Sequence, residues 1–184
     1  MNKLEHLKGK KILFFSVQTF NLEKDIVKQL EKHGALVTYF DERPANNNFT
    51  KGMIRINRNF LKNRIKKYYR NIFNSIKHEK FDYLLVNRGE VIPQDFLEKF
   101  IAIQPECKRI FYTWDSFGNH SHGLSILNYF HKKFEIDLKY SQYQHQLFHL
   151  TVVGLILFSF ESSEFYALYS FVNGLISCNT SSIN

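Results

Sequence analysis

The chain has 184 residues, of which 44% are hydrophobic and 16% aromatic, with only 8 glycines and 3 prolines. This composition excludes a disordered or collagen-like polypeptide, and the length suits one full-sized domain. Two widely separated cysteines exclude a disulfide scaffold and a cysteine zinc site. The net charge of +8 is compatible with an anionic partner, whether nucleic acid, a membrane surface or a sugar phosphate, but selects none of them.

Short apolar runs alternate with helical patterns over roughly the first three quarters of the chain. Runs typical of buried strands occur at residues 12–15, 36–40, 83–86 and 110–112, with a shorter one at 134–136. Apolar residues at helical spacing lie between them, at 22–33, 50–80, 94–103 and 125–130. We therefore predict an α/β fold, a Rossmann-like parallel sheet flanked by helices, with the first four strands in the order third, second, first, fourth.

The pattern at residues 50–80 predicts one long basic amphipathic helix. Its apolar stripe is expected to pack inward through Leu61, Ile65, Tyr68 and Ile72, and its cations Lys62, Lys66 and Arg70 are expected to stay in water. A solvated cationic face explains this pattern. An anionic membrane or a lipid-linked phosphate is the second interpretation, and nucleic acid is the least favoured.

Polar residues follow each of the first four predicted strands, at the edge where open parallel sheets bind ligands. These tips are Ser16-Val17-Gln18-Thr19, Asp41-Glu42-Arg43-Pro44, Asn87-Arg88-Gly89-Glu90 and Thr113-Trp114-Asp115-Ser116. Turn formation and helix capping explain any one of them, whereas four on one edge favour a cleft. No GxGxxG or GxxxxGK[ST] motif and no metal-ligand spacing occurs, so neither a dinucleotide cofactor nor a metal is predicted.

Taken together, the FDERP run at 40–44, the RGE at 88–90 and the YTWDS at 112–116 carry a family resemblance. Over about residues 10–136 the chain resembles the amino-terminal domain of bacterial glycosyltransferases of the CgeB-like, capsule and lipopolysaccharide biosynthesis type. The resemblance implies the GT-B architecture, in which this domain holds a sugar or lipid-linked acceptor and a second domain holds the nucleotide-sugar donor.

The resemblance also implies roles for individual residues on the acceptor side of the cleft. Asp115 or Glu90 would act as the catalytic base, and the substrate would contact Asp41, Arg43, Arg88 and Trp114. No resident cofactor or metal is implied.

The composition changes sharply after Lys139, because all 25 lysines and arginines lie at or before it. We expect a domain at 1–139 and an apolar tail at 140–184. A frameshifted or truncated end is favoured over a natural membrane-associating tail. The apolar stretch at 147–160 is too short to span a bilayer.

The leading hypothesis is therefore the acceptor-side half of a glycosyltransferase, without transfer activity as it stands because the donor domain is missing. The alternative is a non-enzymatic α/β module that uses its basic helix on an anionic membrane or phosphate surface. Whether the chain is an enzyme stays open. The polar start of the chain, with no secretion signal, predicts a cytoplasmic location, and a peripheral position at the inner face of the membrane is the alternative.

Overall fold

The computed structural model describes residues 7–19, 21–113 and 121–135. Its elements in chain order are β1 (Lys11–Ser16), α1 (Leu22–Lys32), β2 (Leu36–Asp41), α2 (Asn48–Asn57), the 3-10 helix η2 (Arg58–Leu61), α3 (Lys62–Ile76), β3 (Tyr83–Asn87), α4 (Gln94–Ile103), β4 (Lys108–Thr113), α5 (Ser121–Ile126), the 3-10 helix η3 (Leu127–Tyr129) and β5 (Lys132–Glu135). The predicted domain boundary and the tail at 140–184 lie outside the described residues.

The five strands form one parallel sheet, which confirms the predicted α/β class. Its order is β2-β1-β3-β4-β5, the doubly wound order of flavodoxin-like folds. The predicted order third, second, first, fourth is wrong, because β3 pairs with β1 and not with β2. The burial of the strands explains the difference. Every residue of β1 after Lys11 is buried, as a central strand requires, whereas no residue of β2 is fully buried and Leu36 is 56% exposed.

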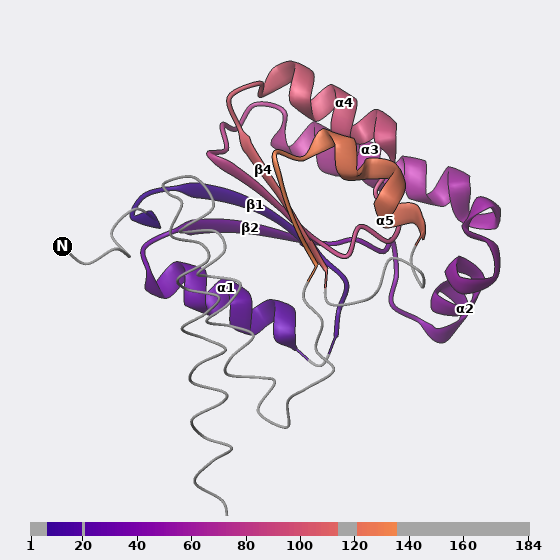
Figure 1. The fold of residues 1–184 in the computed structure, drawn as a ribbon. Coiled ribbons are helices and arrows are strands. Elements are labelled where there is room, and N and C mark those ends of the chain that lie inside the picture. Colours follow the sequence, from indigo (N-terminus) through magenta and orange to yellow (C-terminus); the bar gives the residue numbers. More distant parts are fainter. Residues whose placement is uncertain (1–6, 20, 114–120, 136–184) are drawn as a thin grey trace, which may run out of the picture.

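Two helical layers cover the sheet, with α1 on one face and α3, α4 and α5 on the other (Figure 1). The alternation of side chains along β1 connects the layers. Ile12 and Phe14 pack into the cluster that includes α1, whereas Leu13 and Phe15 pack into the larger cluster that includes α3 and α4. Both core clusters therefore meet at the central strand.

The single long helix predicted at 50–80 is instead two α-helices joined by the turn η2. The break falls at Asn57, whose backbone is extended (φ −161°) and whose side chain accepts a hydrogen bond from the Asn59 N–H. An asparagine side chain commonly ends a helix by bonding the backbone in this way. The predicted faces are confirmed across η2 and α3: Leu61, Ile65 and Ile72 are buried, Tyr68 is half-buried, and Lys62, Lys66 and Arg70 are exposed.

The last predicted elements are shifted along the chain. The helix expected at 125–130 is α5 followed by η3, and it begins at Ser121. The strand expected at 134–136 is β5, which begins at Lys132. Of the helices that the structure describes, none combines the length and the apolar character that a bilayer crossing requires.

Candidate functional site

The carboxyl ends of β1 and β3 lie at the switch point of the sheet. From this point the chain continues to β2 on one side of β1, whereas β3 and the later strands lie on the other side. In open parallel sheets this position favours ligand binding. The residues there are Ser16 and Asn87, both buried, and the Asn87 amide nitrogen donates a 2.8 Å hydrogen bond to the Ser16 hydroxyl. The Asn87 Oδ1 atom has no hydrogen-bond partner among the described residues.

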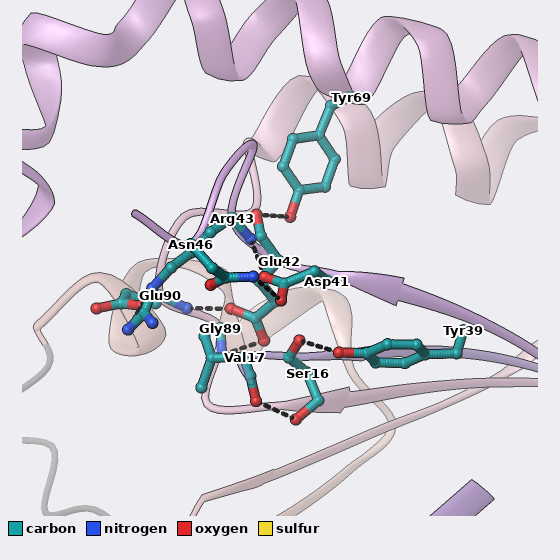
Figure 2. Close-up of polar contacts among 10 residues, drawn as sticks. All are labelled: Ser16, Val17, Tyr39, Asp41, Glu42, Arg43, Asn46, Tyr69, Gly89 and Glu90. Carbon is teal, nitrogen blue, oxygen red and sulfur yellow. Dashed lines mark hydrogen bonds and ion pairs between the residues drawn. The ribbon is translucent and has the colours of Figure 1, made fainter. Parts of the chain in front are cut away.

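Glu42 is the centre of the polar network at this edge (Figure 2). Its fully buried carboxylate accepts hydrogen bonds from two consecutive backbone N–H groups of the loop after β3, at 3.0 Å from Gly89 and 2.6 Å from Glu90. Burial raises the pKa of the Glu42 carboxyl to about 8, although the two N–H donors favour its charged form. We call the contacts of Glu42 with this loop, together with the Arg43–Glu90 ion pair, the β2–β3 latch.

The predicted base Glu90 is engaged in that ion pair. The Arg43 Nη2 and Nε atoms lie 2.6 and 2.7 Å from the Glu90 Oε2 atom, and the two side chains are only 7% and 8% exposed. Such a short, buried contact satisfies each of the two charged groups with the other and shields both from solvent. In this arrangement Glu90 and Arg43 neutralise one another and present little surface to a substrate.

The latch depends on an unusual backbone conformation after β3. Both Arg88 (φ 82°) and Gly89 (φ 63°) have positive φ, a region that side chains with a Cβ disfavour. A Cβ on Gly89 would lie 2.7 Å from a ring carbon of Phe111 and 2.8 Å from the Ile126 methyl group. Glycine is therefore required at position 89 both for its φ and for the space it leaves.

The loop after β2 is anchored to α3 and to itself. The Asp41 carboxylate accepts hydrogen bonds from the Arg43 N–H and the Asn46 amide, each at 2.7 Å, and burial raises its pKa. The Tyr68 hydroxyl donates to the Asp41 carbonyl at 2.7 Å, and the Tyr69 hydroxyl donates to the neighbouring Glu42 carbonyl at 3.0 Å. The two adjacent tyrosines of α3 therefore connect this helix to the end of β2 and the loop that follows it.

The structure thus brings together some of the predicted site residues. Asp41, Arg43 and Glu90 lie in or beside the latch, and Arg88 lies in its strained loop. Trp114 and the predicted base Asp115 lie outside the described residues, so their roles stay predictions. Sequence reasoning listed Glu42 in a strand tip but missed it as the centre of the network, because its partners are 47 and 48 residues away in the chain.

A groove of about 520 Å³ lies between η2, α3, α4 and α5, apart from the residues of the latch. We call it the α3–α4 groove. Its lining includes three cations, two carboxylates and two further polar side chains of α5, namely Arg58, Lys62, Lys66, Asp95, Glu98, His122 and Ser125. Within the described part of the chain, no group of three or more histidine, cysteine or acidic side chains is placed to hold a metal ion.

Comparison with known proteins identifies no family model and no curated protein that matches this chain. Among solved structures it is similar to a BeF3-activated DrrB receiver domain, with a TM-score of 0.43 and 10% identity over 80% of this chain and 94% of that one. It is also similar to a CheY-like response regulator receiver domain from Methanospirillum hungatei JF-1, with a TM-score of 0.42 and 17% identity over 81% of this chain and 91% of that one.

These findings correct the predicted resemblance to capsule and lipopolysaccharide glycosyltransferases, and with it the predicted GT-B type and function, which are wrong. The structure supplies a physical reason. Polar residues of the FDERP and RGE motifs contact one another within the protein. Glu42 accepts hydrogen bonds from Gly89 and Glu90, and Arg43 pairs with Glu90. Polar residues of this kind follow parallel strands wherever the loops must be fastened. The sugar or lipid-linked acceptor that the resemblance implied stays an untested prediction.

Proposed function

We propose that this chain is a peripheral membrane-binding protein that attaches to an anionic lipid surface through α2, η2 and α3. The observation that carries the proposal is the charge of residues 50–78, which we call the basic segment. It contains no aspartate or glutamate, and its cations are Lys51, Arg55, Arg58, Lys62, Arg64, Lys66, Lys67, Arg70 and Lys77. Each lysine or arginine near an anionic leaflet contributes about 1 kcal/mol of attraction.

Large apolar side chains are exposed beside these cations. Phe49 is 67% exposed, Ile56 79% and Phe60 70%, and these three are half of the exposed large hydrophobic residues in the described part of the chain. Phe49 and Ile56 are seven residues apart on α2 and so lie on one side of that helix. An exposed apolar stripe bordered by cations is the pattern of a helix that lies in a membrane interface.

The two contributions support one another energetically. A single weak anchor gives marginal, reversible attachment, and stable binding takes two signals such as an apolar insertion plus a polybasic patch. Burying one phenylalanine or isoleucine side chain is worth about 1.5–3 kcal/mol. Several cations and two or three inserted side chains together supply both signals. The proposed site of attachment is the cytoplasmic leaflet, where anionic lipids are concentrated.

Vesicle co-sedimentation tests this function directly. We expect the protein to sediment with vesicles that mix phosphatidylcholine and phosphatidylglycerol but not with phosphatidylcholine alone, and to be released by high salt. The double variant Phe49→Ser and Phe60→Ser should weaken binding by about tenfold or more, because each substitution removes an inserted side chain.

The matched control is Leu36→Ser, since Leu36 is an exposed apolar residue that lies outside the basic segment, at the start of β2. This variant should bind vesicles like the unaltered protein. Equal sedimentation with neutral and anionic vesicles would contradict the proposal. So would an equal loss of binding in the Leu36→Ser control, or binding to a single-stranded oligonucleotide in place of vesicles.

A further inference from the structure

Arg58 is a half-buried cation without a counterion. Its guanidinium makes no hydrogen bond or ion pair within the described residues, and its Nη1 atom is shielded from solvent without an acceptor. Arginine side chains removed from water are normally paired, because an unsatisfied charged donor costs more than a neutral one. Burial accordingly lowers the pKa of Arg58. An anion at this position would supply the missing acceptor.

The α3–α4 groove offers the space for such an anion. Arg58 lines the groove, and Lys62 and Lys66 line it one and two helical turns further along. The spacing of four residues places these cations along one side of η2 and α3. The groove volume of about 520 Å³ lies within the range of about 300–1,000 Å³ that is usual for small-ligand sites.

The opposite wall carries two carboxylates, which belong to α4. Glu98 accepts a 2.7 Å hydrogen bond from the Tyr129 hydroxyl and so has a partner of its own. Asp95 lies in the first turn of α4, where the helix dipole stabilises a negative charge. These two carboxylates repel an anion, but the three cations of η2 and α3 outnumber them in the lining.

His122 on α5 completes the polar lining. Its Nε2 atom lies 2.9 Å from the Ile92 carbonyl oxygen, and its Nδ1 atom lies 3.0 Å from the Ser125 hydroxyl, which also donates to the His122 carbonyl at 2.8 Å. Only a doubly protonated ring satisfies all three contacts at once, because the Ser125 hydroxyl has a single proton to give. Burial and the nearby Arg58 charge lower the pKa of His122. An anion in the groove would offset that repulsion.

We propose that the α3–α4 groove binds a phosphomonoester group, with Arg58 as its main contact and Lys62 and Lys66 at its open side. A guanidinium suits a phosphate because two of its N–H groups can bond two phosphate oxygens. The phosphate belongs either to a soluble molecule or to a lipid headgroup such as phosphatidic acid. The lipid source rests on the membrane function proposed above, whereas the binding of a soluble phosphate does not depend on it.

Isothermal titration with inorganic phosphate and glycerol phosphate tests the site in solution. We expect both to bind, and Arg58→Gln to weaken binding by about tenfold or more, as for the loss of hydrogen bonds to a charged group. Lys66→Gln, at an exposed position, gives a second variant that does not disturb buried structure and should weaken binding less. The control Lys28→Gln removes an exposed cation of α1, on the other face of the sheet, and should bind as the unaltered protein does.

A second readout is independent of affinity. Phosphate should raise the pKa of His122, measured by NMR titration of its ring protons and assigned with His122→Asn, in the unaltered protein but not in Arg58→Gln. The inference is overturned if neither phosphate binds, if Arg58→Gln binds as Lys28→Gln does, or if the His122 pKa does not change.

Vesicles distinguish the two sources of the phosphate. Preference for phosphatidic acid over phosphatidylglycerol at equal surface charge, lost in Arg58→Gln, assigns the site to a lipid headgroup. Phosphate binding in solution without that preference assigns it to a soluble phosphate. If the protein bound every anionic vesicle but did not bind phosphate, the phosphate site would be overturned and the membrane function would stand. If it bound phosphate but no vesicle, the membrane function would be overturned and the phosphate site would stand.

Discussion

Gly89 is the residue whose replacement is expected to harm the fold most directly. Gly89→Ala introduces a Cβ at a positive φ and within 3 Å of Phe111 and Ile126. Backbone strain and overpacking together should lower the free energy of unfolding by about 2–4 kcal/mol. Urea denaturation followed by circular dichroism measures this loss.

The chain provides a matched control for this substitution. Gly52 lies inside α2, and a Cβ there would meet no atom within 4 Å. Gly52→Ala should raise the free energy of unfolding by about 0.5–1 kcal/mol, because alanine favours a helix. If both substitutions changed stability alike, the role assigned to Gly89 would be wrong.

Glu42 is expected to make stability depend on pH. Its folded pKa of about 8 lies above the ordinary value for glutamate, so between these two values the folded protein holds a proton that the unfolded chain has released. Stability from this group is therefore fully present at low pH and is lost as pH rises through about 8, with a slope of at most about 1.4 kcal/mol per pH unit.

Two variants separate the contribution of Glu42 to the pH dependence of stability from that of the histidines. In Glu42→Gln the titrating group is absent, so the decline of stability between mildly acidic and mildly basic pH should be reduced relative to the unaltered protein. Glu31→Gln, on an exposed part of α1, should leave the decline as it is. A decline of equal slope in the unaltered protein and in Glu42→Gln would rule out Glu42 as its source.

The charges at the amino end of α3 interact unfavourably with the helix dipole. Its first turn holds Lys62 and Arg64 and no acidic residue, although the amino end of a helix favours negative charge. Lys62→Glu should therefore raise the free energy of unfolding by about 0.3–1 kcal/mol. The same substitution should weaken attachment to anionic vesicles by about 2 kcal/mol, since it reverses one cation of the basic segment.

Lys77→Glu is the control at the opposite end of the same helix. Lys77 caps the carboxyl end of α3, where a positive charge is favourable, so its reversal should lower the free energy of unfolding. Both variants change the net charge equally. Thermal melts that shift in the same direction for the two variants would contradict the dipole argument.

The strands were predictable from sequence because a short apolar run such as Ile-Leu-Phe-Phe in β1 is typical of a strand that is buried on both faces. The helix break at Asn57 was not, since the apolar spacing continues through it while a local asparagine side chain ends α2. The order of the sheet was not predictable either. Strands that follow one another in the chain usually pair in the sheet, whereas β3 here pairs with β1 and not with β2. The incomplete burial that marks β2 as an edge strand is a property of the folded structure.

The candidate sites show the same division. The strand tips were found because polar residues directly follow apolar runs, which is a local pattern. The β2–β3 latch was missed because Glu42 and Gly89 are brought together only by the loops of two strands that do not pair with each other. The α3–α4 groove draws its lining from η2, α3, α4 and α5, and no spacing in the sequence reports such a surface.

For the whole molecule, the described core residues extend from Leu7 to Phe130. We therefore expect a chain ending at Lys139 to unfold cooperatively, with a free energy of unfolding within about 1 kcal/mol of that of the full chain, because it keeps every one of these residues. Circular dichroism melts of the two chains make the comparison. Loss of a cooperative transition in the shorter chain would show that the fold requires residues after Lys139.

The place of β1 in the sheet also constrains how the chain folds during synthesis. Ser16 and Asn87 are bonded although they are 71 residues apart, and a ribosome takes several seconds to add that many residues at about 5–20 per second. Throughout this interval one edge of β1 has no partner strand while its apolar side chains have already been made. Lys10 and Lys11, directly before the apolar run, supply the like charges that discourage two such nascent strands from pairing with each other.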